Sequence, residues 1–444
     1  MAFPTSPTNG QQANINGITY TYSSAATAWT VSTSVSNTFV SINVSANVNS
    51  GNVLATGLIS ATGNILTGGL ISAAGNISAN NATTGNLTVD GNTTLGDAST
   101  DTILMTGAPS IGGAGYGMGM GFRNRIINGA MVIDQRNAGA SVTASTNTFA
   151  VDRMQVYASV ASKFTAQQNA GSVTPPSGFT NYLGVTSSSA YSSAAGDVFV
   201  ILQNIEGYNT ADLGFGAAGA STVTLSFWVR SSLTGLFGGS LVNEAYNRAY
   251  PFSYTINSAN TWEQKSITIA GDTSGTWVKT NGAGIRLYID LGCGSSYQGT
   301  AGAWASSGYT SVTGATSVVG TNGATFYITG VQLEKGSTAT AFDYRPYGTE
   351  LVLCQRYYET INMVGNSYYN GSNGCPTLIP QNTRKRAQPT VTRTNDNWDS
   401  WNVNMGNYNE TSDAAGGISV WCNVTGGTTG FVRWSTTLLI SAEL

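Results

Sequence analysis

The chain has 444 residues, of which only 9% are charged, and its formal net charge is −3. Nucleic-acid binding requires a basic face that such a balance does not supply, so nucleic acid is excluded as an expected partner. The sequence contains no histidine, which removes histidine-based nucleophile pairs and the commonest transition-metal ligand. We expect no metal site and no cofactor. The 55 glycines and the 10% of aromatic residues are typical of an all-β protein rich in turns.

The four cysteines lie far apart and have no CxxC spacing, so we expect free structural thiols rather than a zinc site or a disulfide framework. They are Cys293, Cys354, Cys375 and Cys422. The first residues carry neither a basic nor an apolar signal-peptide region, and no window of about eighteen apolar residues occurs. We therefore expect a protein that is made and folded in a cytoplasm and does not insert into a membrane.

Residues 1–40 are predicted to form a small hairpin module. Apolar and polar residues alternate on both sides of Gly17, and the few large side chains are aromatic. The pattern FPTSPTNGQ, NGITYTY and AW resembles the short N-terminal module of many tailed-bacteriophage fibre and appendage proteins. The resemblance implies that this module attaches the chain to other virion tail or adaptor proteins. The residues expected to do so are Phe3, Tyr20, Tyr22 and Trp29.

Residues 41–110 are predicted to form a repetitive β shaft. The first charged residue of the whole chain is Asp90, and a Gly-Asn dipeptide returns at intervals of twelve, twelve and ten residues. A unit this short has too few apolar side chains to fold alone, so several copies must pack together. Three intertwined chains, and hence a homotrimer, satisfy this need. A flexible Gly/Ser/Thr/Asn linker and a single-chain β-solenoid remain open as alternatives.

A glycine-rich linker is predicted over residues 111–122, and a two-sheet sandwich of the jelly-roll kind over residues 123–348. Runs of period two, separated by polar turns, favour this fold. The clearest predicted strands are residues 222–230, 263–270, 284–291 and 324–333. Within them, Phe227, Trp228 and Ile328 are predicted to be core residues.

Five motifs in this region resemble the carbohydrate-binding-module-like domain of phage tail fibres and receptor-binding proteins. They are NRIINGAMVIDQR (124–136), VDR (151–153), GVQLE (330–334), FDYRP (342–346) and CQRYY (354–358). They follow one another in the order that this family has. One departure is Met154, where the family usually has tryptophan after the Asp-Arg pair, and this affects local packing. The resemblance implies a tail fibre that binds a host surface polysaccharide or lipopolysaccharide.

Residues 349–444 resemble the C-terminal β-sandwich tip of the same proteins. Residues 349–359 are predicted to begin as one helical turn and to continue as a strand. The tip contains the segment NDNWDSWN, in which flat aromatic faces stand beside carboxylates and amides, the groups that sugar recognition needs. The predicted glycan-binding residues are Trp398, Trp401, Asp396, Asp399, Asn402 and Tyr408, with Tyr368 and Tyr369 in a second polar-aromatic loop.

Weaker candidates lie in or beside the Gly/Ser-rich loops of the sandwich. They are Trp262, Trp277, Tyr297, Trp304 and Tyr309. As an alternative for the tip, its tryptophans fill a small core. An enzymatic alternative is a depolymerase that uses Asp396 and Asp399 as a carboxylate pair. A third alternative is a structural virion protein without a ligand of its own. The function predicted from the sequence is a non-catalytic phage tail fibre, located in the virion.

Overall fold

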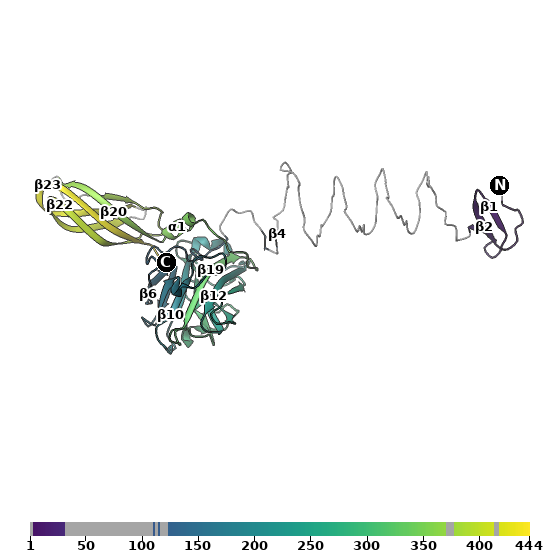
Figure 1. Ribbon diagram of the computed structural model, residues 1–444, viewed down its shortest axis with the longest axis horizontal. Helices are drawn as coiled ribbons and strands as arrows, with labels where there is room; N and C mark the ends of the chain where they lie inside the picture. Colours follow the sequence, from purple (N-terminus) through teal and green to yellow (C-terminus); the bar gives the residue numbers. More distant parts are fainter. Residues whose placement is uncertain (1–2, 32–109, 112–113, 116–122, 370–376, 413–416) are drawn as a thin grey trace. The chain divides into compact units, whose positions relative to one another are not determined.

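In the computed structural model, the described residues are 3–31, 110–111, 114–115, 123–369, 377–412 and 417–444. The chain divides into two compact units, Met1–Leu95 and Gly96–Leu444. The fold is all-β, as predicted, with one nine-residue α-helix among the described residues (Figure 1). The predicted shaft and linker lie outside the described residues, except for β4 (Ser110–Ile111) and β5 (Ala114–Gly115), which pair antiparallel. The shaft hypothesis therefore stays a prediction.

The N-terminal module is a three-stranded antiparallel sheet, which confirms the predicted hairpin. Its strands are β1 (Gln12–Ile15), β2 (Ile18–Ser23) and β3 (Ala28–Val31). Asn16 and Gly17 connect the first two strands with φ values of 51° and 84°, as a two-residue hairpin with two left-handed positions requires. This is why an Asn-Gly pair stands there.

The four aromatic residues of this module pack together. The Phe3 ring centroid lies 5.0 Å from those of both Tyr20 and Trp29, and the Tyr22 centroid lies 5.5 Å from that of Trp29. No residue between 3 and 31 is fully buried. The module therefore has an aromatic cluster but no core of its own.

Two six-stranded antiparallel sheets make the predicted sandwich. In the first sheet the order is β15 (Glu263–Ile269), β12 (Val223–Ser231), β19 (Thr325–Lys335), β10 (Leu183–Ser187), β9 (Phe164–Gln168) and β6 (Val142–Thr143). In the second it is β14 (Ala249–Ile256), β13 (Gly235–Val242), β16 (Ala283–Asp290), β11 (Phe199–Glu206), β8 (Met154–Ala158) and β7 (Thr148–Val151). The chain passes repeatedly from one sheet to the other, as in a jelly roll.

Short elements fill the connections of the sandwich. The 3₁₀ helices are η1 (Ala170–Ser172), η2 (Gly207–Asn209), η3 (Ala211–Leu213) and η4 (Ser295–Tyr297). The strands β17 (Gln298–Gly299) and β18 (Ser311–Val312) pair in parallel. Each of the four clearest predicted strands coincides with an observed strand, β12, β15, β16 or β19, to within two residues at either end.

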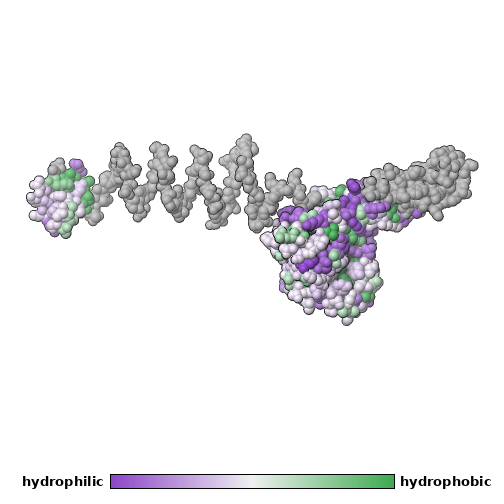
Figure 2. Space-filling view, turned by 180° about the vertical axis from the view of Figure 1, so that it is seen from behind, coloured by the Kyte–Doolittle hydropathy of each residue, from purple (hydrophilic) through white to green (hydrophobic). Residues whose placement is uncertain are grey.

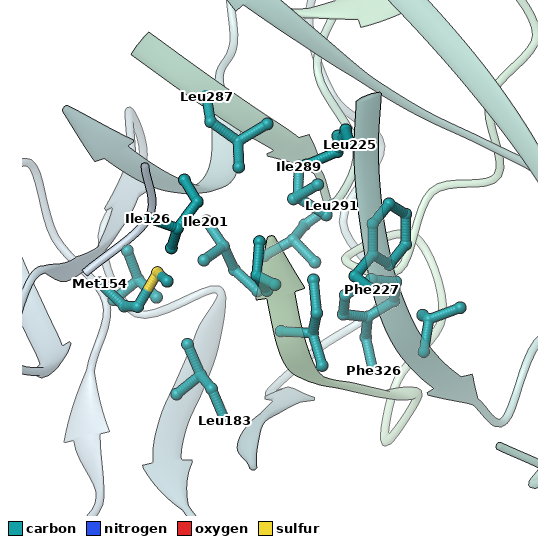
Figure 3. Close-up of a cluster of buried hydrophobic side chains, with 14 of the residues drawn as sticks. Ile126, Met154, Leu183, Ile201, Leu225, Phe227, Leu287, Ile289, Leu291 and Phe326 are labelled. Carbon is teal, nitrogen blue, oxygen red and sulfur yellow. The ribbon is translucent and has the colours of Figure 1, made fainter. Parts of the chain in front are cut away.

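The hydrophobic core lies between the two sheets. Figure 3 shows Leu225 and Phe227 of β12 and Phe326 of β19 with Ile201 of β11 and Ile289 of β16. All five are at most 2% exposed. Since successive side chains of a strand point to opposite faces, each of these strands places every second residue in the core.

The core predictions are right for two residues and wrong for the third. Phe227 is 0% and Ile328 is 1% exposed, but Trp228 is only half-buried. Trp228 follows Phe227 directly, so alternation places it on the outer face of the sheet, where the β12–β19 register also shifts. Met154 is 3% exposed and belongs to the core, so the departure from the family's tryptophan falls at a packing position.

The motif residues that carried the resemblance mainly hold the backbone together. The Asn124 side chain accepts hydrogen bonds from the Ile126 and Leu333 amides and donates one to the Val331 carbonyl. Asn128, with φ of 59°, donates to the Ile133 and Asp152 carbonyls. These side chains satisfy buried backbone groups, so they specify the fold rather than a surface site.

The C-terminal region begins with α1 (Tyr347–Gln355) and continues into β20 (Tyr358–Tyr369), which confirms the predicted change from helix to strand. Further strands are β21 (Thr377–Pro380), β22 (Thr390–Ser412) and β23 (Gly417–Ser441). All four strands belong to one sheet, in which β20, β21 and β22 each pair antiparallel with β23. A second sheet of the expected tip sandwich is not found among the described strands. In the described parts of the chain, no helix has the length and hydropathy to cross a membrane.

Candidate functional site

A cleft of about 610 Å³ lies on the outer face of the second sheet. Its floor is formed by three neighbouring strands, β8, β11 and β16, through the side chains that point away from the core. In one row across these strands, Leu202 of β11 lies between Gln155 of β8 and Tyr288 of β16. Val200 faces Tyr157 in the next row. The cleft has the size of a typical small-molecule site.

The floor is apolar and separate from the main core. Val200, Leu202 and Tyr288 are buried and form their own cluster with Val242 and Cys293. Cover for these outer-face residues comes from two loops, one between β13 and β14 and one between η4 and β18. Because β11 and β16 carry apolar side chains on both faces, their outer face also needs cover, and the two loops that cover it form the cleft.

Tyrosines line the walls. Tyr246, in the β13–β14 loop, is 48% exposed and has a φ of 55°. Tyr297, the last residue of η4, lines the cleft and packs against the floor cluster. The two wall loops touch at Gly308, where a Cβ atom would lie 2.7 Å from the Tyr246 carbonyl oxygen. A side chain at this position would push the walls apart, which explains the glycine.

Polar groups in the cleft are connected to one another. The hydroxyl oxygens of Tyr246 and Tyr288 lie 3.1 Å apart. Arg286 Nη1 donates to Asn204 Oδ1 at 2.9 Å, and the Arg286 guanidinium lies 5.0 Å from the Tyr246 ring centroid. Arg286 Nη2 is 3.9 Å from a Glu244 oxygen. Of the described residues that line the cleft, Arg286 is the only one with a charged side chain.

The surroundings of Tyr288 keep its hydroxyl protonated. Burial raises the pKa of the Tyr288 hydroxyl well above its usual value, and the neighbouring Tyr246 adds to this effect. Tyr288 thus remains a hydrogen-bond donor at all physiological pH values. The side chains that line the cleft thus offer hydroxyl and amide groups together with one guanidinium.

A buried carboxylate beside Val200 of the floor fixes the second wall loop. Asp290 accepts hydrogen bonds from the Gly292 and Cys293 amides at 2.8 and 2.7 Å and from the Ser311 hydroxyl at 2.6 Å. Burial raises the pKa of Asp290. Since Tyr297 lies between Cys293 and Ser311 in the chain, these bonds anchor both ends of the loop that carries it.

The cleft has binding chemistry but lacks the usual hydrolytic chemistry. Aromatic faces pack against the apolar C–H surfaces of sugar rings, and hydroxyl, amide and guanidinium groups bond to their hydroxyls. Glycoside hydrolysis usually needs two carboxylates on either side of the bond, and no described residue lining the cleft is Asp or Glu. Elsewhere in the described residues, no group of three or more Cys, Asp or Glu could hold a metal ion.

The predicted tip residues lie in strands rather than in loops, which corrects the expectation of a second loop at Tyr368 and Tyr369. Both end β20, whereas β22 contains Asp396, Trp398, Asp399, Trp401, Asn402 and Tyr408. Phe431 of β23 pairs with Tyr368 on one side and with Trp401 on the other, so the backbone brings these two together. Asp396 and Asn402 fall at register shifts. The side chains of all eight residues lie outside the described part.

The weaker loop candidates divide into two groups. Trp277 is 6% exposed, and its ring centroid lies 5.0 Å from that of Phe215 and 5.4 Å from that of Trp304, so it is a core residue rather than a surface contact. Trp262 packs edge-on against Tyr182. Tyr297 lines the cleft, and Tyr309 packs against its floor cluster.

Sequence reasoning missed the cleft itself. One usable signal was present: β11 reads FVILQNIE and β16 reads AGIRLYID, so both carry large side chains on both faces. On the face of the molecule seen in Figure 2, the sandwich surface is mainly purple and white, with hydrophobic residues in separate small spots. No broad apolar patch marks a site on that face.

No protein-family model and no curated protein matches the sequence. Several solved structures are similar at low level. The enzymatically active domain of tailspike protein 4 of bacteriophage CBA120 is 13% identical, with a TM-score of 0.25, and the match covers 48% of this chain and 21% of that chain. TmCBM61 in complex with β-1,4-galactotriose is 11% identical, with a TM-score of 0.25, over 48% of this chain and 99% of that chain.

The family 11 carbohydrate-binding module from Clostridium thermocellum, in complex with a β-1,3-1,4-mixed-linked tetrasaccharide, is 8% identical, with a TM-score of 0.24. It matches 45% of this chain and 98% of its own length. At these identities, the similarities concern the fold alone. A functional conclusion must therefore come from the side chains of this chain.

Proposed function

We propose that this protein binds a cell-surface glycan in the cleft on the outer face of the second sheet. One observation carries the proposal: Tyr157 and Tyr288 in the floor and Tyr246 and Tyr297 in the walls bring four rings to one cleft, together with amide and guanidinium groups. Rings supply the faces on which sugars pack, and the polar groups fix their orientation. The protein acts as a binding protein and not as an enzyme.

The test is binding of the full-length protein to a panel of oligosaccharides by calorimetry. The panel contains β-1,4-galactotriose, a β-1,3-1,4-mixed-linked tetrasaccharide, and uronic-acid and lipopolysaccharide-derived oligosaccharides. Tyr246→Ala and Tyr297→Ala should weaken binding at least tenfold, about 1.4 kcal/mol each. Tyr208→Ala, which removes a ring that is 62% exposed outside the cleft, is the matched control. Equal binding by all three variants would locate the ligand elsewhere, and no binding by the wild type would contradict the proposal.

The biological setting that we propose is a tailed-bacteriophage fibre or appendage, supported by the five motifs in residues 124–358 and by the N-terminal pattern. Residues 1–40 attach it to the virion, with Phe3, Tyr20, Tyr22 and Trp29 as contacts, and residues 41–110 form the shaft of a homotrimer. Three clefts on one fibre raise avidity for a weakly bound sugar. Light scattering on the full-length protein should give a trimer, and a monomer would refute the shaft.

A second contact is proposed at the C-terminal sheet, where Tyr368 and Trp401 flank one residue of β23. Trp398→Ala and Trp401→Ala should then reduce adsorption to host cells without changing affinity at the cleft. New reducing ends in host polysaccharide, abolished by Asp396→Asn or Asp399→Asn, would instead favour the depolymerase alternative. Absence of both effects would leave these residues a structural role.

A further inference from the structure

Residues 442–444 leave β23 and lie against the sandwich at one end of the cleft. The Arg386 guanidinium donates to the Ala442 and Glu443 carbonyl oxygens, both at 2.6 Å. The Glu443 carboxylate pairs with Arg136 at 2.7 Å and, through its other oxygen, with Arg153. Three arginines thus fix this segment.

A continuous set of hydrogen bonds leads from this segment into the cleft. The Leu444 carbonyl oxygen accepts from Asn204 Nδ2 at 2.8 Å, and Leu444 itself lines the cleft. The same Asn204 side chain accepts from Arg286 Nη1 at 2.9 Å, and its backbone carbonyl accepts from Arg153 Nη2 at 2.5 Å. Asn204 therefore contacts both Leu444, in the segment 442–444, and Arg286, whose side chain is the only charged one among the described residues that line the cleft.

We propose that Glu443 is a positioning residue for the glycan cleft. Its ion pairs with Arg136 and Arg153 hold Leu444 in place, Leu444 orients Asn204, and Asn204 fixes the guanidinium of Arg286. The cleft is then a composite, built by the sandwich together with a segment that follows β23. This inference rests on the proposed function, because it assigns a role within the same binding site.

Burial explains why one charge can control this set of bonds. The side chains of Arg153, Glu443 and Arg136 are 2%, 10% and 17% exposed. Removal of the carboxylate leaves two poorly solvated guanidinium groups without their partner, so the segment must rearrange. The coupling is reciprocal: if the ordered segment 442–444 raises glycan affinity by some factor, then bound glycan favours the ordered segment by the same factor.

The experiment compares Glu443→Gln and Glu443→Asp with the wild type in the full-length protein. Glu350→Gln is a matched control, because the Glu350 side chain is also 10% exposed and pairs with a buried arginine, Arg345, away from the cleft. The probe is the panel oligosaccharide that the wild type binds most tightly, measured well below each unfolding temperature. We expect Glu443→Gln to weaken binding about tenfold, Glu443→Asp to restore part of it, and Glu350→Gln to stay within about twofold.

Amide hydrogen exchange supplies a measurement that needs no ligand. In unliganded Glu443→Gln, exchange should accelerate around Arg286 in β16 and Asn204 in β11, but not in Glu350→Gln. Wild-type affinity and wild-type exchange in Glu443→Gln would overturn the inference while leaving the proposed function intact. If no oligosaccharide binds the wild type, the proposed function fails, and the exchange data still decide whether Glu443 positions Arg286.

Discussion

The two faces of the second sheet, which runs from β14 to β7, differ in composition although adjacent residues of the same strands form them. In β16, Leu287 and Ile289 point into the core, whereas Arg286 and Tyr288 face the cleft. The inner face is buried and carries aliphatic and aromatic core residues, and the outer face combines a small apolar floor with rings and polar groups. Under the proposed function, stability and binding are assigned residue by residue along a strand, so single substitutions should separate them.

The largest effect is expected on the inner face. Leu287→Ala removes a side chain that is 3% exposed and leaves a cavity between the sheets. It should lower the free energy of unfolding by about 2–5 kcal/mol in chemical denaturation. A loss below about 1 kcal/mol would mean that this face does not carry the core.

A buried carboxylate at the edge of the same sheet should give a pH-dependent effect of similar size. Burial raises the pKa of Asp152 to about 6, although Gln135 and Arg136 act against the shift. The folded state therefore keeps a proton that the unfolded chain releases, and this contribution is present below pH ~4 and lost as the pH rises through about 6.

Asp152→Asn removes this titration. Between pH 4 and 7, the unfolding free energy of the wild type should fall by about 2.5 kcal/mol more than that of the variant. Denaturation at a series of pH values measures the difference. Parallel curves for the two proteins would place the Asp152 pKa near its ordinary value.

An intermediate effect is expected where the outer face is itself buried. Tyr288 is 5% exposed, and Tyr288→Phe removes the hydroxyl that lies 3.1 Å from that of Tyr246. The unfolding free energy should fall by about 1 kcal/mol, because the partner hydroxyl can still reach water. If Tyr288→Phe lowered the unfolding free energy as much as Leu287→Ala, the outer face would contribute to stability as strongly as the inner face.

The smallest effect on stability is expected at the rim of the cleft. Tyr246→Ala should change the free energy of unfolding by less than about 0.5 kcal/mol, because its ring is 48% exposed. The same variant should lose glycan affinity. Thermal unfolding together with calorimetry checks both, and a large loss of stability would show that Tyr246 supports the loop rather than the ligand.

Local patterns predicted the strands well, because period-two alternation depends on neighbours in the chain. Strands β12, β15, β16 and β19, the Asn16-Gly17 turn and the start of β20 all follow from such patterns. The error at Trp228 came from reading hydrophobicity without assigning the face. A tryptophan next to a core phenylalanine must point the other way.

The cleft could not be predicted in the same way. Its residues come mainly from β8, β11, β16 and two loops, with Leu444 after β23, and the strand order of the sheet makes most of them neighbours. Strand order is set by pairing between distant segments, which no single window contains. The glycan site was predicted in the NDNWDSWN segment because its aromatic and acidic residues are adjacent in sequence. In the structure this segment is not a loop but part of strand β22.

Alternation in β11 and β16 also bears on how the protein can evolve. Every second position of these strands faces the cleft side, so under the proposed function new specificities can arise by point substitution while the intervening core positions stay unchanged. An insertion or deletion of one residue has the opposite outcome, because it would exchange the two faces and move Tyr288 and Arg286 into the core. Selection on such a scaffold should therefore accept substitutions within these strands and confine length changes to the loops around Tyr246 and Tyr297.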